Sequence, residues 1–169
     1  MENVIKNFFV ADHERIDALL DVATADAENI DMDLYHQFRV GILTHIKMEE
    51  KILFPAAQYA NGGVPLPLAA ELRLEHGAIT SLMVPPPTPD LIKVLKYVLH
   101  LHDDKEERRG GMYDKCAELT ESETESLLRQ LQQTTPVPVH PHNLQDYALD
   151  VAKRALTRAG YDYDAIAAQ

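Results

Sequence analysis

The sequence predicts an all-α fold, an up-down-up-down four-helix bundle followed by two additional C-terminal helices. Apolar residues recur at helical spacing along almost the whole chain of 169 residues, which indicates amphipathic helices. Clusters of proline and glycine interrupt that spacing and divide the chain into four long segments and two shorter ones. The connections between the long segments are short, which favours antiparallel neighbours in a bundle.

The first two helices are expected over about residues 3 to 27 and from about Asp33 to the neighbourhood of Tyr59. Asp33 is the expected N-cap of the second helix, and Pro55 is expected to kink it. One face of the first helix carries Phe9, His13, Ile16 and Leu20. One side of the second carries Phe38, Ile42, His45, Glu49 and Ile52. Both apolar faces therefore include polar residues that can bind metal.

The third and fourth helices follow the same pattern. The third begins near Pro67 and ends at the proline cluster from Pro85 to Pro89. The fourth is expected to begin at an Asp90 cap and to reach about Leu119, with Gly110-Gly111 interrupting it. The third helix places Leu72, His76, Ile79 and Met83 on one face. The fourth places Leu95, Val98, Leu99, His102 and Glu106 on one face.

Residues 1–118 are expected to form the bundle, and residues 119–169 a C-terminal helical extension. Thr120 and Glu123 resemble a capping box for a fifth helix, and Asn143 is the expected cap of a sixth that ends before Gly160. The sixth helix has an apolar stripe made of Leu144, Tyr147, Ala148, Val151, Ala152 and Ala155. Such an apolar stripe must be buried. It can pack on the bundle, or it can form an interface with a second copy or with a partner protein. The chain is accordingly expected to be a monomer or a homodimer joined through these helices.

Charge and composition indicate which kinds of binding partner and which cellular location to expect. The net charge of −11 opposes binding to nucleic acid or to an anionic membrane, and it suits a protein that attracts cations. The single cysteine, Cys116, cannot form an intramolecular disulfide, and the N-terminal residues do not resemble a secretion signal. The longest uncharged run, residues 52–70, is broken by proline and glycine. We therefore expect a cytoplasmic protein without a membrane segment.

Six inward-facing residues are predicted to bind metal: His13, His45, Glu49, His76, His102 and Glu106. A His and a Glu four residues apart lie one helical turn apart on one face, and this pair occurs twice. The four histidines lie about 9 to 12 residues from their helix starts, roughly 15 Å, so they can meet in one layer. A single inward histidine is more often a core residue. Two buried glutamates with no Lys or Arg on the inner faces at that depth, however, need a positive partner, which metal ions supply.

The remaining histidines and nearby acids are expected to lie outside this set. Helical angles turn His36 and His100 away from the bundle, and two prolines place His140 and His142 in a loop, where both are expected to be exposed. Three acids close to the ligand positions are expected to be solvated or to contact a ligand: Asp17, Glu50 and Glu107. Asp17, four residues after His13, is also an alternative ligand, and it or water could fill an open metal position.

The residues together resemble the hemerythrin-like proteins, which have an HHE cation-binding domain. The resemblance covers about residues 3 to 118 and rests on His13, the two His and Glu pairs, the segment Ile52-Leu53-Phe54-Pro55 and the dipeptide Glu75-His76. It implies a four-helix bundle around a non-haem di-iron centre. By this resemblance, Glu49 and Glu106 bridge two iron ions, and the four histidines are terminal ligands.

One departure from the family's oxygen carriers bears on function. Those proteins have two histidines four apart in the third helix, whereas here Leu72 precedes His76 and Thr80 follows it. The missing histidine leaves open metal positions, which favours sensing or buffering of oxygen, nitric oxide or iron over simple oxygen carriage. A di-iron oxidoreductase, peroxide-consuming or ferroxidase-like, is the alternative. A small diatomic ligand or peroxide is the expected partner, and manganese or zinc could replace iron in such a ligand set.

Overall fold

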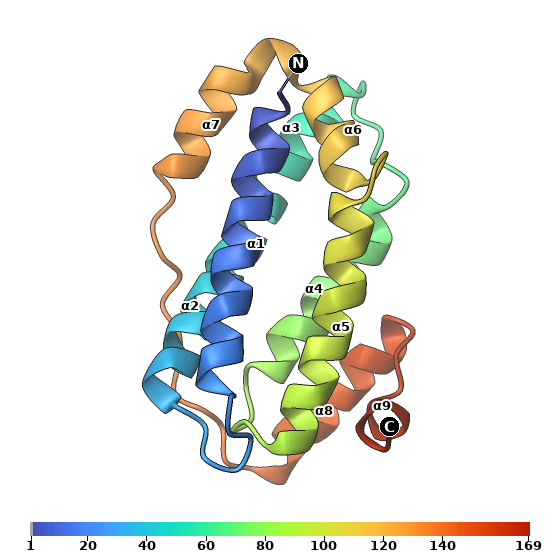
Figure 1. The fold of residues 1–169 in the computed structure, drawn as a ribbon. Coiled ribbons are helices and arrows are strands. Elements are labelled where there is room, and N and C mark those ends of the chain that lie inside the picture. The colour runs from blue at the N-terminus through green and yellow to red at the C-terminus, as the bar shows by residue number, and fades with distance from the viewer. Residues whose placement is uncertain (1) are drawn as a thin grey trace.

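Four long helical segments run antiparallel, side by side, along the length of the molecule (Figure 1). The structure is a computed structural model that describes residues 2–169, and within these residues every regular element is helical. The four segments are α1 (Val4–Ala23), α2 (Met32–Met48), α4 (Ala69–Leu82) and α5 (Pro89–Glu107). The predicted all-α bundle with extra C-terminal helices is confirmed. None of the helices in this part of the chain combines the length and apolar character needed to cross a membrane.

The second bundle segment changes its helical pitch beside the predicted site. After α2 the chain forms a π-helical turn, η1 (Glu49–Leu53), and then continues as α3 (Phe54–Ala60). The backbone N–H of Phe54 donates to the carbonyl of Glu49, five residues earlier. Pro55 has no N–H to donate and its ring clashes with a regular helix in the preceding turn, which explains the wide turn at this point. The sequence therefore predicted the disturbance at Pro55, and the structure shows it as a π turn that begins at Glu49.

Three helix ends differ from those expected. The first helix ends at Ala23 instead of residue 27, because the Thr24 hydroxyl donates to the Leu20 carbonyl and Asp26 forms a tight turn with Glu28. The Asp31 side chain, not that of Asp33, caps α2. In the fourth segment the cap is Thr88 instead of Asp90. Pro89 takes the first helical position, which fits a residue without an N–H, so the cap must precede it.

A break at Gly110-Gly111 separates α5 from α6 (Met112–Leu119). Gly110 has a φ of 74°, which favours glycine, and a Cβ on Gly111 would lie 2.6 Å from the carbonyl oxygen of Lys105. The chain can therefore turn tightly here and direct α6 back over the end of the bundle. This turn places Tyr113, on α6, in the interior.

Two apolar clusters fill the bundle, and a polar layer lies between them. One cluster includes Ile16, Ile42 and Ile79, and the other includes Phe9 and Leu72. Along three of the four bundle helices the predicted metal-binding histidine falls between a residue of one cluster and a residue of the other. The six predicted residues thus sit in the interior, with apolar packing on both sides.

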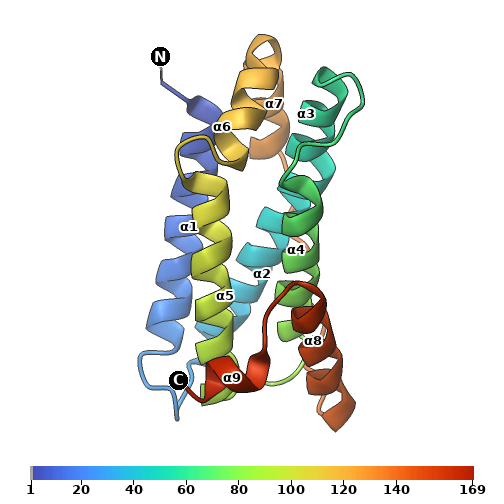
Figure 2. The same cartoon turned by 90° about the vertical axis from the view of Figure 1, so that its right-hand side faces the viewer.

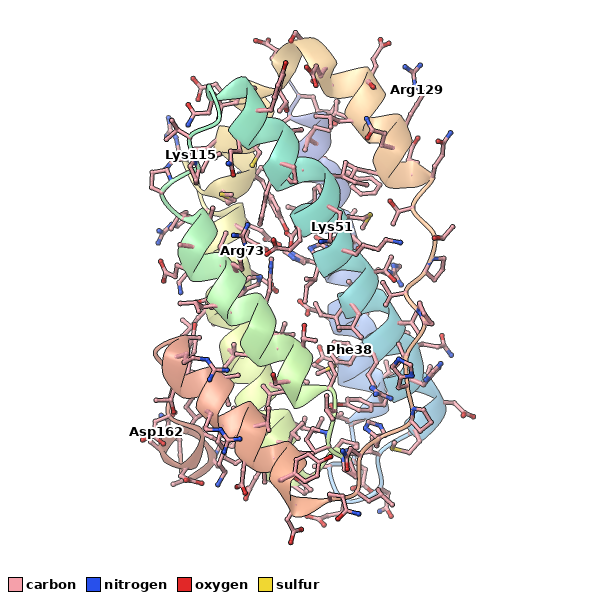
Figure 3. The ribbon with its side chains drawn as sticks, turned by 180° about the vertical axis from the view of Figure 1, so that it is seen from behind. Phe38, Lys51, Arg73, Lys115, Arg129 and Asp162 are labelled. Carbon is pink, nitrogen blue, oxygen red and sulfur yellow. The ribbon has the colours of Figure 1, made fainter. Side chains whose placement is uncertain are left out.

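The C-terminal extension wraps the outside of the bundle (Figures 2 and 3). It consists of the 3₁₀ turn η2 (Glu121–Glu123), α7 (Thr124–Gln132), α8 (Asp146–Arg158) and the short helix α9 (Tyr163–Ala167). Helix α8 packs on α4, and α9, which was not predicted, packs on α5. The linker between α7 and α8 follows α2, where the Arg39 side chain donates to the carbonyl of His140.

Two predicted caps in the extension were wrong. Thr120 does not form a capping box, because its hydroxyl donates to the Cys116 carbonyl and the helix begins only at Thr124. Asn143 does not cap α8 either, because its side chain accepts from the N–H of Gln145 in the turn before the helix. Of the apolar stripe, the alanines are buried against the bundle, and Leu144, Tyr147 and Val151 are exposed.

Candidate metal centre

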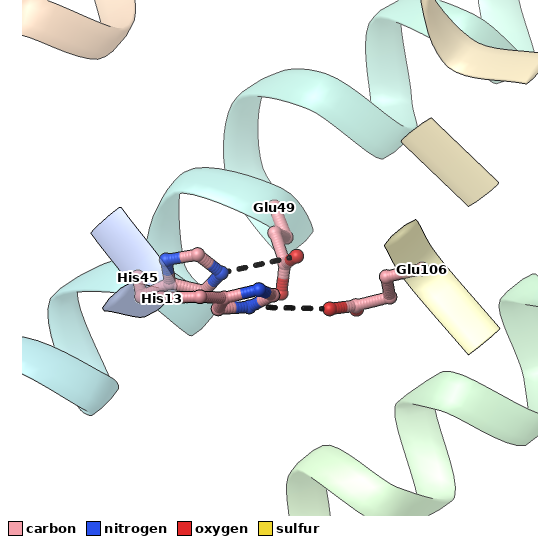
Figure 4. A group of neighbouring side chains, drawn as sticks. All are labelled: His13, His45, Glu49 and Glu106. Carbon is pink, nitrogen blue, oxygen red and sulfur yellow. Dashed lines mark ion pairs between the residues drawn. The ribbon is translucent and has the colours of Figure 1, made fainter. Parts of the chain in front are cut away.

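The structure brings the six predicted residues together in one buried layer. Their exposed fractions range from nothing to 4%. They form two overlapping groups, in each of which one N or O atom per residue lies within 4.8 Å of the others. His13, His45, Glu49 and Glu106 form the first group, which is drawn in Figure 4. Glu49, His76, His102 and Glu106 form the second. We refer to the two as the His13–His45 side and the His76–His102 side, which share both glutamates.

Each glutamate lies between histidines from two helices. Glu49, in the π turn, has one carboxylate oxygen 3.4 Å from Nε2 of His45 and the other 3.0 Å from Nε2 of His76. Glu106 on α5 lies 3.1 Å from Nε2 of His102 and 3.4 Å from Nε2 of His13. Both His and Glu pairs are four residues apart, one turn of helix, as the sequence predicted. This arrangement would allow each carboxylate to bridge two ions.

The opposite ring nitrogen of every histidine is held by a carboxylate outside the centre. The pairs are His13 with Glu107 at 2.5 Å, His45 with Asp12 at 2.8 Å, His76 with Glu50 at 2.7 Å and His102 with Glu75 at 2.7 Å. In all four the atom that contacts the outer carboxylate is Nδ1. A carboxylate that accepts the Nδ1 proton fixes the ring and leaves Nε2 to face a metal ion. All four Nε2 atoms point to the shared glutamates.

The pKa values of the centre reflect two buried carboxylates that need positive charge. Burial alone lowers the pKa of His45, but the nearby charge of Glu49 and the hydrogen bond to Asp12 raise it to about 10. The same balance applies to His102. Burial lowers its pKa, but the charge of Glu106 and the hydrogen bond to Glu75 raise it to about 9. Burial raises the pKa of Glu49, but the two histidines beside it hold that pKa well below its usual value. Protons on the histidines therefore neutralise the site, and metal cations could take their place.

A tyrosine that the sequence analysis did not single out enters the His13–His45 side. Tyr113 is completely buried, and its ring stacks on Phe9 with centroids 5.0 Å apart. Its hydroxyl oxygen lies 2.6 Å from Glu49, 2.9 Å from Glu106, 3.1 Å from His45 and 3.3 Å from His13. One hydroxyl therefore contacts all four residues of the first group. Atoms that bind one first-row ion at about 2.1 Å lie about 3 Å apart, and these distances fit that separation.

Several polar atoms on the His76–His102 side lie close to one another or to a histidine nitrogen, but their angles do not allow a hydrogen bond with any described residue. They are Oε2 of Glu49, Nε2 of His76 and Oε1 of Glu106, all of them buried. Buried polar atoms are almost always paired, and an unpaired group of this kind costs about 1–3 kcal/mol. The three atoms belong to one group and face one another within 4 Å. A cation bound between these three atoms would serve as a partner for all of them. The residues present therefore fit a metal.

A cleft of about 590 Å³ between α1 and α5 reaches the centre at His13. Acidic side chains line much of it, among them Asp17, Asp103 and Glu107. Burial raises the pKa of Asp103 to about 7, and one of its carboxylate oxygens lies 3.6 Å from Nε2 of His13. The other acidic side chains of the lining outnumber Lys96 and Arg108, so the cleft offers cations a negatively charged route to the site even where Asp103 is protonated.

The residues predicted to lie near or outside the centre fall as follows. Glu50 and Glu107 contact His76 and His13, which was one of the two expected positions for them. Asp17 lines the cleft. His36, His100 and His140 are exposed, whereas His142 is half-buried because its ring stacks on Tyr35, 6.0 Å between centroids. The contacts of Asp12 with His45 and of Glu75 with His102 had no counterpart in the sequence pattern, because each contact joins two different helices.

The fold and this site define a class: helical-bundle proteins with a buried histidine and carboxylate site for cations. The sequence model of the hemerythrin HHE cation-binding domain matches residues 4–109, and the chain belongs to this family. Family membership and the two buried His and Glu groups together indicate a metal-binding protein. No curated protein and no solved structure matches the chain. Tyr113 and the C-terminal extension lie beyond the matched residues.

Proposed function

We propose that the protein binds two iron ions in a non-haem dinuclear centre and senses or buffers oxygen, nitric oxide or iron. His13 and His45 would hold one ion, His76 and His102 the other, and Glu49 and Glu106 would bridge them. Iron in such a site supplies reversible redox chemistry and open positions for small ligands. The chain's own residues hold the ions, orient the imidazoles and exclude bulk water.

The observation that carries this proposal is the common orientation of the four histidines. Each donates Nδ1–H to an outer carboxylate and presents Nε2 to a shared glutamate. Core histidines that only fill space need no such pairing on both ring nitrogens. Four repetitions of one arrangement, on four helices, support a site shaped for two cations with oxygen and nitrogen ligands.

We further propose that Tyr113 is a ligand to the ion on the His13–His45 side. Its oxygen lies within 3.3 Å of all four residues of that group, and Phe9 fixes its ring. It would thereby fill a metal position on that side, whereas the position that the absent third-helix histidine leaves open lies on the other side, beside His76. On the His76–His102 side, buried atoms of His76, Glu49 and Glu106 form no hydrogen bond with any described residue, so a small exogenous ligand would bind there.

Iron is favoured over manganese and zinc by the family and by the mixture of imidazole, carboxylate and phenol groups, although all three metals accept such ligands. The test is elemental analysis of untagged protein after anaerobic loading with ferrous iron. We expect about two iron atoms per chain, as in other di-iron bundles. Absence of bound metal after loading would refute the proposal and leave the fold alone.

A second function, a ferroxidase-like or peroxide-consuming oxidoreductase, is favoured by the acidic cleft that ends at His13. Such a route would deliver ferrous ions repeatedly to the site. Steady-state assays with ferrous iron or hydrogen peroxide separate the two functions. Consumption of many substrate molecules per chain would establish an enzyme. Stoichiometric binding of nitric oxide or oxygen without turnover would support sensing or buffering.

A further inference from the structure

The C-terminal extension makes a direct polar contact with the residue that holds His102. The loop between α8 and α9 carries Tyr161, whose hydroxyl donates to Oε1 of Glu75 at 2.8 Å. The other oxygen of Glu75, Oε2, accepts from Nδ1 of His102 at 2.7 Å. Lys105 also donates to Oε1 of Glu75, and it forms an ion pair with Glu71 at 2.7 Å. One carboxylate thus joins the extension to the predicted metal centre.

Tyr161 is fixed in place by the fold of the extension. Gly160, with a φ of 93°, ends α8 in the left-handed conformation, and the N–H of Tyr161 donates to the Leu156 carbonyl. The Tyr161 ring meets Tyr97 of α5 edge to face, with centroids 6.4 Å apart. Because α8 packs on α4 and α9 on α5, this hydroxyl can reach Glu75 only while the extension is docked.

Glu75 differs from the other three carboxylates that hold ligand histidines. The side chain of Glu75 is completely buried, whereas those of Asp12, Glu50 and Glu107 are 16%, 18% and 33% exposed. An exposed carboxylate that loses a protein donor regains water, but a buried one stays unpaired, which is costly. The position of Glu75 therefore depends on the donors that surround it, and one of them comes from the extension.

We propose that Tyr161 is a positioning residue through which the C-terminal extension and the metal centre stabilise each other. The docked extension holds Glu75, Glu75 holds the His102 ring, and His102 holds its ion. By reciprocity, an ion bound at His102 fixes Glu75 and tightens the docking of α8 and α9. This inference rests on the proposed function, because it requires that His102 bind metal. It gives the extension a role in reporting metal occupancy at the surface.

The test compares Tyr161→Phe with a matched control, Tyr147→Phe, in the full-length protein. Tyr147 is an exposed tyrosine of α8 whose hydroxyl accepts from the Asn143 side chain. Amide hydrogen exchange is measured over residues 146–167 with and without iron, and iron release to a chelator is followed in each protein. In the wild type, we expect iron to slow exchange in this segment. In Tyr161→Phe that effect should vanish, and one of the two ions should leave about 3- to 10-fold faster, somewhat less than the loss of a direct histidine partner causes.

The possible outcomes distinguish a failure of the proposed coupling through Tyr161 from a failure of the proposed iron binding. Tyr147→Phe should behave as the wild type in both measurements. Iron binding by the wild type with unchanged exchange in residues 146–167, or normal iron release from Tyr161→Phe, would overturn the coupling and leave the proposed function standing. Failure of the wild-type protein to bind iron would overturn both. A variant that is merely destabilised would exchange faster with and without iron, yet would keep the difference between the two states, which also contradicts the coupling.

Discussion

The two sides of the centre have the same kinds of candidate ligand but different surroundings. Each has two histidines, and both use Glu49 and Glu106. On the His13–His45 side the Tyr113 hydroxyl contacts every member of the group. On the His76–His102 side, buried atoms of His76 and of both glutamates are left without hydrogen-bond partners among residues 2–169. Repetition of one sequence motif has therefore produced two sites that are not equivalent.

The difference originates in the chain beyond the bundle helices. The Gly110-Gly111 break turns α6 back over the His13–His45 side and places Tyr113 there. On the other side the extension contributes Tyr161, which contacts the outer carboxylate Glu75 and not the centre itself. Under the proposed function, one tyrosine would close a metal position, and the other would support His102 from outside the centre. We therefore expect the two ions to differ in ligand binding and in spectrum.

The largest effect is expected from the residues that the two sides share. Glu49→Gln or Glu106→Gln keeps the side-chain volume but removes the negative charge that would bridge the ions. Because both sides lose a ligand at once, iron content should fall from about two to less than one per chain. Elemental analysis measures this directly. Glu118→Gln, at an exposed position, is the control and should keep its iron. Full iron content in either bridging variant would contradict the proposed centre.

The next effect should be confined to one side. His102→Ala removes a ligand from the His76–His102 side only, and His45→Ala does the same on the other side. Each variant should retain about one iron, since the remaining ion keeps its own histidines and at least one carboxylate. The two should differ in colour, because only His102→Ala keeps the ion beside Tyr113. Loss of both ions from both variants would mean that the two positions bind only as a unit.

The sequence predicted the fold and the meeting of the six residues because both depend on helical periodicity. Phe9, His13 and Ile16 lie on one face whatever the partner helices are, so inward residues could be identified before packing was known. The predicted depths were only roughly right, since His76 is the eighth residue of α4 and His45 the fourteenth of α2, yet the histidines still lie in one layer. That these residues bind metal remains a prediction, supported by the family and by the geometry.

The features that could not be predicted from the sequence depend on contacts between different helices. Tyr113 lies seven residues after Glu106, a spacing that would share a face in a continuous helix, but Gly110-Gly111 made that face unpredictable. Asp12 neighbours His13 in sequence but holds His45 on another helix, and Glu75 meets Tyr161 over 86 residues of chain. Such pairings require the packing of α1 on α2 and of the extension on α4 and α5. The caps at Asp31 and Thr88 were missed because several capping residues stood close together.

The pH dependence of stability should show what the two sides have in common. In the metal-free protein the pKa of His45 is about 10 and that of His102 about 9, both above the unfolded value of about 6.5. Because these histidines bind a proton more tightly in the folded state, they contribute to the free energy of unfolding. This contribution is complete below about pH 6.5 and is lost as the pH rises through about 9 to 10. Metal-bound histidines do not carry the extra proton, so the loaded protein should not lose stability in this way.

Melting temperatures of metal-free and iron-loaded protein between pH 6.5 and 9 test this dependence. The gain in melting temperature on iron loading should grow as pH rises across this range. A gain that is constant or that shrinks would mean that the histidines do not exchange protons for metal. The same measurement on His45→Ala and His102→Ala should show a weaker pH dependence in both, because each variant lacks one of the histidines whose pKa is raised.

The smallest change in metal content, and the sharpest test of the difference between the sides, is expected from Tyr113→Phe. The substitution removes one oxygen from the His13–His45 side and leaves its histidines and carboxylates in place, so about two iron atoms should remain. A phenol oxygen bound to ferric iron absorbs visible light through charge transfer from oxygen to metal. The wild-type ferric protein should show such a band, and Tyr113→Phe should lose it. Under anaerobic conditions the ferrous variant should also bind nitric oxide at both ions, where the wild type binds it at one.

Tyr35→Phe is the matched control for this experiment. Tyr35 is also completely buried, its hydroxyl has no hydrogen-bond partner among the described residues, and it packs on Phe38 in the other apolar cluster. Its loss should change neither the visible band nor the stoichiometry of nitric oxide. If Tyr113→Phe kept the band, Tyr113 would be only a hydrogen-bond donor to the glutamates, and both ions would have comparable open positions. The difference between the two sides would then lie in packing alone, and the sensing chemistry could not be assigned to the His76–His102 side.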